Sequence, residues 1–187
     1  MINFDIDTDE LKLIGDELAA TPKQIQMSFS RALNRTAATL RRMSSRGLQS
    51  ELQLRNATEI RRRLKQLRVK RTRDMTEIRL WYGKNDMRLS SFKGRAVADS
   101  KGASFIGGPN GRQEFTGGFI AKSKSGRRTI FKRKGKSPLP IVEQKMPVSE
   151  KMQLFLEDKI FADIEDIFFK HFRADLAART RLGVGRQ

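Results

Sequence analysis

The chain has 187 residues, which suffice for one folded domain with arms but not for two large domains. Its 39 lysines and arginines outnumber its 21 acids, and the formal net charge of +18 favours an acidic protein surface or a polyanion as partner. Cysteine is absent and His171 is the only histidine, which excludes disulfides, thiolate zinc sites and a metal centre with several histidines. No run of about 18 uncharged apolar residues occurs either, so we expect no membrane span and no secretion signal.

The positive charge is concentrated in the middle of the chain. Residues 1–20 carry six acids and one lysine, residues 21–136 carry thirty basic and seven acidic side chains, and residues 137–187 carry eight of each. This distribution predicts an acidic N-terminal arm over 1–20, which folds back on the protein, reaches a basic neighbour or stays solvated. We expect a single α+β domain over 21–187, composed of a helical basic part (21–73), a part with strands and loops (74–148) and a C-terminal helix (149–182).

The first strong helix is predicted to begin at Thr21. Thr21 and Gln24 have the spacing of a capping box, and Pro22 occupies the first helical position, where proline is favoured. Apolar residues then recur at steps of three and four as far as Met43, which predicts one face packed on the core. A second flank carries a basic row that faces solvent or a partner, formed by Arg31, Arg35, Arg42 and Arg46.

A second, shorter helix is predicted to begin at Asn56, with Ile60, Leu64 and Leu67 on its buried side. Eight cations and no acid lie among the thirteen residues from 61 to 73. Neighbouring cations on a helix repel each other, and DNA or an acidic partner would relieve that repulsion. The predicted contact residues are Arg61, Arg62, Arg63, Lys65, Arg68, Lys70, Arg71 and Arg73.

The apolar period changes to two between Met75 and Tyr82, which predicts a strand that ends at Gly83. Residues 84–136 are rich in glycine and basic residues, yet short apolar segments interrupt them. We interpret these segments as mostly antiparallel strands joined by long basic loops, with one long loop as the alternative. The predicted strands are 103–106, 119–121 and 129–131, the turns are 107–111 and 117–118, and residues 141–148 are extended.

The last helix is predicted from Glu150 to about Arg181, a stretch without proline or glycine. Its apolar arc is wider than the roughly 100° that one contact needs, which indicates one contact with its own sheet and another with a second chain. Self-association is the hypothesis that follows. The predicted subunit-interface residues are Leu154, Phe161, Phe169 and Phe172.

The sequence contains no arrangement of residues typical of catalysis. Residues 135–137 resemble the end of a phosphate-binding loop, but Ile130 occupies the required glycine position and Pro138 prevents the helix that should follow. His171 lies in the apolar stripe of the last helix, which favours a neutral imidazole bonded to a neighbour over a general base. The acids of that helix alternate with lysines, as on a solvated surface. We therefore expect no enzyme activity, no catalytic residue, no cofactor and no metal site.

Four segments of the chain resemble the minor tail protein Z family of long-tailed phages. They are LRNATEIRRRLK at 54–65, FTGGFIA at 115–121, IFKRKGK at 130–136 and LPIVEQKMPV at 139–148. Their order along the chain carries the resemblance: a turn of small residues before an aromatic strand, then a strand that ends in basic residues, then a Leu-Pro-Ile segment.

This resemblance implies a structural virion protein that completes the tail and has no catalytic role. It implies a homo-oligomeric ring, a hexamer, at the head-proximal (neck) end of the tail, in contact with other tail and neck proteins. Double-stranded DNA in the channel would be a non-specific partner. The protein would reside in the virion after assembly in the host cytoplasm. The residues alone support one alternative, a sequence-independent nucleic-acid-binding protein that uses the basic run from Arg61 to Arg73.

Overall fold

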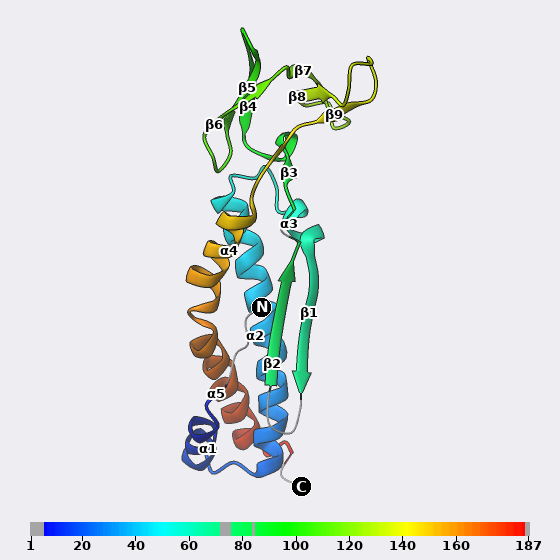
Figure 1. The fold of residues 1–187 in the computed structure, drawn as a ribbon. Helices are drawn as coiled ribbons and strands as arrows, with labels where there is room; N and C mark the ends of the chain where they lie inside the picture. Colours follow the sequence, from blue (N-terminus) through cyan, green and yellow to red (C-terminus); the bar gives the residue numbers. More distant parts are fainter. Residues whose placement is uncertain (1–5, 72–75, 84, 186–187) are drawn as a thin grey trace. The chain divides into compact units, whose positions relative to one another are not determined.

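A computed structural model describes residues 6–71, 76–83 and 85–185, and describes residues 64–71 and 76–82 by their backbone (Figure 1). The fold is α+β, and every pair of neighbouring strands in this described part is antiparallel. The predicted fold class is confirmed. The chain divides into two compact units: Met1–Ser44, Leu64–Tyr82 and Glu157–Gln187 form the first, and Ser45–Arg63 and Gly83–Leu156 form the second. The predicted division at residue 20 stays a prediction.

The first unit is built around helices. It contains α1 (Thr8–Glu17), the first part of α2 (Pro22–Glu51), the hairpin of β1 (Leu64–Arg71) and β2 (Thr76–Tyr82), and α5 (Ile164–Leu182). Apolar side chains of α1, α2 and α5 are buried together. Phe168 lies at the centre of this apolar core. The centroid of its ring is 5.5 Å from that of Phe29 and 6.0 Å from that of Phe172. Burial of such rings supplies much of the free energy that holds the helices together.

The start of α2 confirms the predicted capping box. The backbone N–H of Gln24 donates to Thr21 Oγ1 at 3.3 Å, and the backbone N–H of Thr21 donates to Gln24 Oε1 at 3.0 Å. These two bonds satisfy donors that a helix start otherwise leaves without partners. Helix α1 has a similar cap, because Asp7 Oδ1 accepts from the backbone N–H of Asp9 at 2.8 Å.

The helix predicted from Asn56 is wrong beyond Arg63. Helix α3 (Thr58–Arg63) has six residues, and Leu64–Arg71 then forms β1, paired with β2. In this register Leu67 lies opposite Leu80, and Val69 lies opposite Ile78. Ile60, Leu64 and Leu67 fit a helical period, but strand β2 offers backbone hydrogen bonds to residues 64–71. Pairing with the second strand of the hairpin therefore overrides the local helical pattern.

The second unit is built from small sheets. The structure contains the predicted strands and turns at 103–106, 107–111, 117–118, 119–121 and 129–131. The sheets are β3 (Met87–Arg88) with β10 (Lys145–Met146); β4 (Gly94–Asp99), β5 (Gly102–Gly107) and β6 (Arg112–Thr116); and β7 (Phe119–Lys122), β8 (Arg128–Arg133) and β9 (Ile141–Glu143). The end of α2, α3, the 3-10 helix η1 (Leu89–Ser91) and α4 (Ser149–Leu156) complete the unit.

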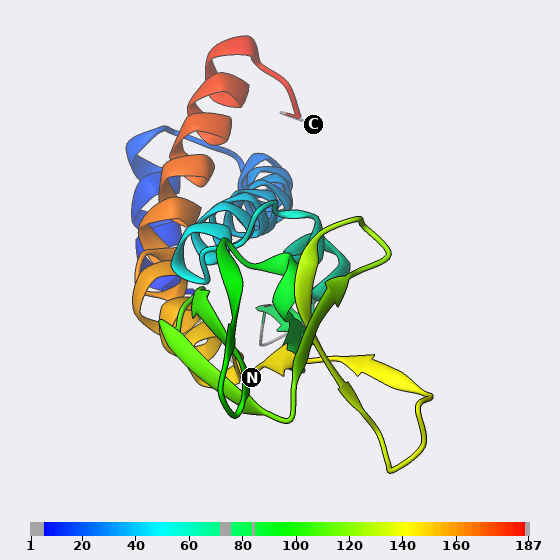
Figure 2. The ribbon, with the colours of Figure 1, turned by 90° about the horizontal axis from the view of Figure 1, so that it is seen from above.

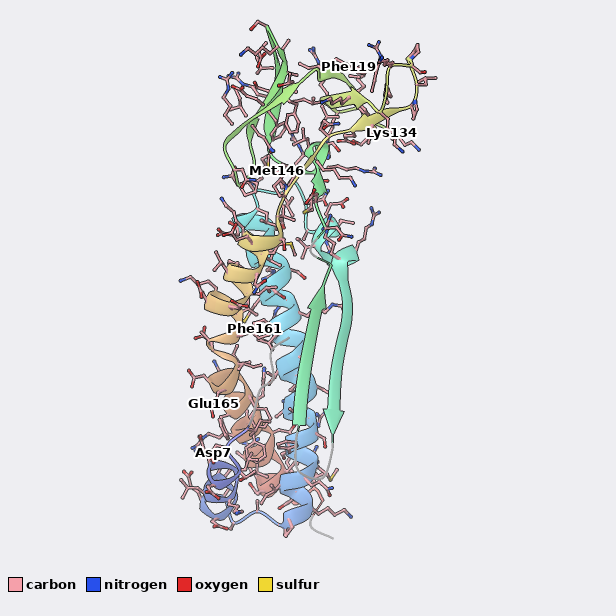
Figure 3. The ribbon with its side chains drawn as sticks, in the orientation of Figure 1. Asp7, Phe119, Lys134, Met146, Phe161 and Glu165 are labelled. Atoms are coloured by element: carbon pink, nitrogen blue, oxygen red, sulfur yellow. The ribbon has the colours of Figure 1, made fainter. Side chains whose placement is uncertain are left out.

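The core of the second unit lies under these sheets. Phe92, Phe105 and Ile130 are buried there, together with Leu54 and Met146. Figure 2 shows the strands in green to yellow, with the loop between β8 and β9 extending away from them. Residues 132–142 comprise this loop and the adjoining ends of β8 and β9, and all of them are exposed. Figure 3 shows Lys134 in this loop. This sheet therefore presents an edge strand, β9, next to a solvated basic loop.

The long C-terminal helix over Ser149–182 is confirmed, but it is not continuous. Helix α4 ends at Leu156, the π-helical turn η2 (Glu157–Phe161) follows, and α5 begins at Ile164. Gly183 ends α5 in the left-handed conformation, with φ of 67°. The sequence pattern did not predict the π-helical turn.

Candidate functional site

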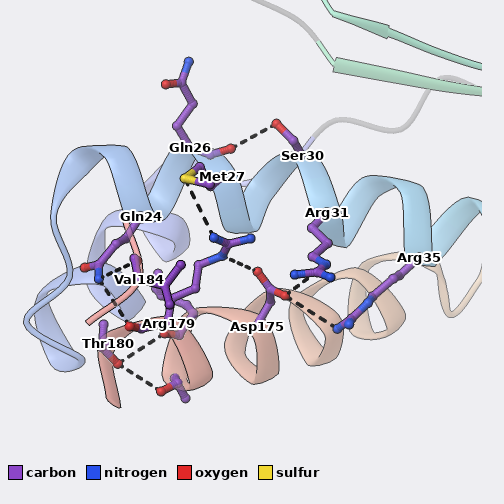
Figure 4. Close-up of polar contacts among 12 residues, drawn as sticks. Gln24, Gln26, Met27, Ser30, Arg31, Arg35, Asp175, Arg179, Thr180 and Val184 are labelled. Carbon is purple, nitrogen blue, oxygen red and sulfur yellow. Dashed lines mark hydrogen bonds and ion pairs between the residues drawn. The ribbon is translucent and has the colours of Figure 1, made fainter. Parts of the chain in front are cut away.

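One basic surface of the first unit is organised by a single buried acid. The Asp175 side chain on α5 is 6% exposed and contacts three guanidinium groups (Figure 4). Arg179 Nε donates to its Oδ2 at 2.7 Å, while Arg31 Nε and Arg35 Nη1 lie 3.6 and 3.7 Å from its Oδ1. We call these four residues the Asp175 cluster. Its three cations exceed its one acid, so the cluster carries a surplus of positive charge.

The Asp175 cluster connects α2 to α5. A buried carboxylate is stable only when paired, and Arg179, one turn further along α5, supplies the buried partner. Arg31 and Arg35 belong to α2 and remain 58% and 46% exposed. Two members of the predicted basic row are thus held in place on one side while their other N–H donors face solvent.

His171 lies beside this row, in a shallow cavity of about 360 Å³ lined by Arg35, Ala38, Thr39 and Arg42. Its Nε2 atom is 3.1 Å from Thr39 Oγ1, which confirms the predicted bond to a neighbour. Burial lowers the pKa of His171, and the positive charges of Arg35, Lys170 and Arg42 lower it further. The imidazole is therefore neutral at pH 7.

The last two members of the basic row are also exposed. Arg42 lines the His171 cavity in the first unit, and Arg46 lies on the part of α2 that belongs to the second unit. Contact of this row with a partner stays a prediction.

The basic run from Arg61 to Arg73 is divided between a helix and a strand. Arg61 and Arg62 are exposed on α3, but Arg63 donates to the backbone oxygens of Gly83, Asn85 and Asp86. Burial lowers the pKa of Arg63, and the charges of Glu59 and Asp86 partly oppose that effect. Arg63 thus fixes the chain after β2. Lys65, Arg68, Lys70 and Arg71 belong to β1 by their backbone, and Arg73 lies outside the described residues.

The second unit contains a groove that we call the basic groove. It has a volume of about 670 Å³ and receives side chains from α3, η1, the turn between β7 and β8, and strands β3, β8, β9 and β10. Five cations line it, from elements far apart in the sequence: Arg62, Arg88, Lys124, Arg127 and Lys145. Three apolar side chains, those of Phe131, Ile141 and Val142, also line it.

The two acids of the basic groove already have partners. Glu143 Oε1 accepts from the backbone N–H of Ser90 at 3.0 Å and from Thr129 Oγ1 at 3.3 Å. Glu59 lies 3.7 Å from Arg62. By contrast, Arg88, Lys124 and Lys145 make no ion pair with another described residue. The groove therefore presents uncompensated positive charge beside apolar surface.

The predicted interface residues fall into two groups. Phe172 is fully buried and stacks on Phe168, and Phe169 packs edge-on against the same ring at 5.3 Å. Leu154 is 52% exposed, and Phe161 is half-buried. Much of the wide apolar arc is thus covered by the chain's own helices, and contact of these four residues with another subunit stays a prediction.

Sequence reasoning missed the basic groove. The available signals were a cluster of serines and cations at 123–127 and a separate pair of serines at 90–91. Among the described residues, no group of three or more histidine or acidic side chains could hold a metal ion. Nor does any helix of that part combine the length and the apolar character needed to cross a bilayer.

Together, the described residues form an α+β protein with two strongly basic surfaces. The profile of one family, prophage minor tail protein Z (GPZ), matches residues 17–186. The chain therefore belongs to the prophage minor tail protein Z family, a family of structural phage tail proteins. No curated protein and no solved structure matches the chain. Membership gives it a structural role in a virion tail, together with other tail proteins.

Proposed function

We propose that this protein completes the phage tail by forming a ring at its head-proximal end, where it joins the tail to head-side neck proteins. The match to the family over residues 17–186 carries the proposal. The ring, its position and the number of six subunits are what resemblance to the family implies. Closed rings of identical subunits are a common way to build such an assembly, because each subunit presents the same two surfaces to its neighbours.

Contact with double-stranded DNA in the channel is part of this proposal. Exposed arginines such as Arg31, Arg35 and Arg42 would neutralise phosphates without reading sequence. These side chains are exposed on the surface of α2, so the contacts would be weak and salt-dependent. Such contacts suit DNA that must move through the channel. In this role the protein is not an enzyme, and it would be assembled in the host cytoplasm before it is part of the virion.

The alternative of a free nucleic-acid-binding protein is less well supported. It requires the run from Arg61 to Arg73 to act as one surface, but the chain changes from helix to strand at Leu64. Arg63, the third residue of the run, is engaged with backbone oxygens. Family membership favours the tail role independently.

The test is the copy number of the protein in purified particles, measured by quantitative mass spectrometry against the major tail subunit. We expect a fixed value of about six per particle, as for one closed ring. Cryo-electron microscopy of the same particles should place the additional density at the head-proximal end. Absence from the particles would contradict the tail role, and a copy number that scales with tail length would contradict a single ring.

A further inference from the structure

Among the described residues, strand β9 of the basic groove pairs with another strand along one edge only. The sheet has the order β7-β8-β9, so β9 pairs with β8 on one side only. Val142 lies opposite Lys132, and the flanking bonds run from Gln144 N to Ile130 O at 2.8 Å and from Lys134 N to Pro140 O at 3.1 Å. In an antiparallel ladder alternate residues bond to the same neighbour, so the backbone groups of Ile141 and Glu143 are directed away from β8. They can pair with an added strand.

The charges around this edge indicate which charge an added strand should carry. Arg88, Lys124 and Lys145 line the groove without an ion pair to another described residue, and Arg127 is held at its side by a bond to Ser90 O at 3.3 Å. The two groove acids are occupied by hydrogen bonds or by Arg62. Acidic side chains of an incoming segment would therefore meet several cations and no free carboxylate.

The apolar lining distinguishes a polypeptide from a nucleic acid. Phe131, Ile141 and Val142 line the same groove, and Ile141 and Val142 remain 40% and 43% exposed. Apolar side chains of an extended peptide would remove this surface from water. A DNA duplex is stiff on this length scale and would contact only the outer cations, leaving the apolar lining hydrated and phosphates close to Glu143.

We propose that the basic groove binds an extended acidic segment of a neighbouring tail protein, which adds a strand to β9. Backbone hydrogen bonds to Ile141 and Glu143 hold the segment, alternate apolar side chains cover Val142, and alternate acids contact the groove cations. The inference rests on the tail role of the protein and not on the ring, the neck position or DNA contact.

The experiment uses the full-length protein and a fluorescein-labelled octapeptide of alternating glutamate and valine. Fluorescence anisotropy is recorded at about 0.05 M salt, because exposed ion pairs are screened at higher ionic strength. We expect saturable binding, no binding of the alternating lysine-valine peptide, and about tenfold weaker binding of the alternating glutamate-glycine peptide. Hydrogen exchange should slow at the amides of Ile141 and Glu143 when the peptide is bound, which simple charge attraction would not produce.

Arg127 and Arg128 provide a matched pair of variants. The residues are adjacent and exposed, and each change to glutamate alters the net charge equally, but only Arg127 lines the groove. We expect Arg127→Glu to weaken peptide binding about tenfold or more and Arg128→Glu to weaken it less than about twofold. Thermal unfolding checks that both variants are folded. If Arg127→Glu is not, Lys124→Glu on the same turn replaces it.

Three results would overturn the inference. The first is equal loss of binding in both variants, which would indicate attraction by the net charge alone. The second is unchanged exchange at Ile141 and Glu143 in the complex. The third is displacement of the peptide by a short DNA duplex whose own binding depends on Arg127, which would assign the groove to nucleic acid. Because these measurements use isolated protein, they are independent of the copy number in particles, and failure of one proposal leaves the other testable.

Discussion

The two basic surfaces of this protein hold their positive charge in different ways. In the first unit, Arg31 and Arg35 are fixed by a buried carboxylate between two helices. In the second unit, Lys124 and Lys145 line an open groove beside an apolar strand edge, without an ion pair in the described part of the chain. Cations of the first unit thus contribute to helix packing, whereas those of the groove in the second unit remain available to bind a partner. The predictions below test whether this distinction between structural and available side chains holds.

The largest effect is expected at Phe172, a predicted interface residue that the structure buries. Phe172→Ala removes a ring that stacks on Phe168 and leaves a cavity, so we expect a loss of about 4 kcal/mol in the free energy of unfolding. Leu154→Ala, at an exposed site, should change it by less than about 0.5 kcal/mol. Urea titration followed by circular dichroism measures both. Similar losses would show that Leu154 is also buried and would break the distinction.

These two variants also separate folding from assembly. If Leu154 is part of a subunit interface, Leu154→Ala should lower the oligomeric mass seen by light scattering while the unfolding midpoint stays unchanged. A fully assembled and fully stable Leu154→Ala protein would remove that residue from the predicted interface.

A smaller but clear effect is expected at Asp175. Asp175→Ala leaves the buried Arg179 guanidinium without its carboxylate, and loss of one partner of a buried pair costs about 3 kcal/mol. Asp166→Ala on the same helix removes an exposed acid and is the matched control, with an expected change below about 0.5 kcal/mol. Thermal unfolding of the two variants measures this difference in stability. If Asp175→Ala unfolded at the wild-type temperature, the Asp175 cluster would not anchor α2 to α5.

The smallest effect is a pH dependence from His171. Its pKa is lowered in the folded state, so the unfolded chain binds the proton more readily. The native state should therefore be most stable above the unfolded pKa of about 6.5 and lose stability as the pH falls below it. The His171→Gln variant should lack this component. Urea midpoints of both proteins between about pH 5 and pH 8 measure the difference.

Because His171 is the only histidine, its proton resonances in a nuclear magnetic resonance titration report the folded pKa directly. A folded pKa at the model-peptide value would remove this pH dependence, and a folded pKa above that value would reverse its sign. Either result would also show that the positive charges of Arg35 and Arg42 do not act on the ring.

Local signals in the sequence predicted much of the fold. The capping box at Thr21 and Gln24 lies within four residues and therefore defines the start of α2 without knowledge of the rest of the chain. The turn at 107–111 follows equally from its glycines, since Gly108 and Gly111 have φ of 69° and 68°. Strand β1 could not be assigned in this way, because Ile60, Leu64 and Leu67 fit a helix until the pairing with β2 is known.

The candidate site was harder to predict for the same reason. The basic groove combines residues near 60, 90, 125 and 142, and only the register of β8 with β9 and the position of η1 bring these segments together. The Asp175 cluster similarly joins side chains about 140 residues apart. From the sequence, Arg31 and Arg35 could be assigned to an exposed flank of a helix, but not to a buried acid on another helix.

The pairing of Arg31 and Arg35 with Asp175 has a consequence for recognition. A free arginine on a surface samples many rotamers, and a ligand that fixes it opposes that conformational entropy, at about 1 kcal/mol or more per side chain. Arg31 and Arg35 already have restricted rotamers in the folded chain, while more than two-fifths of each side chain faces solvent. An anion that approaches α2 therefore meets two preorganised donors, and its association loses less entropy than contact with flexible lysines of the same charge would.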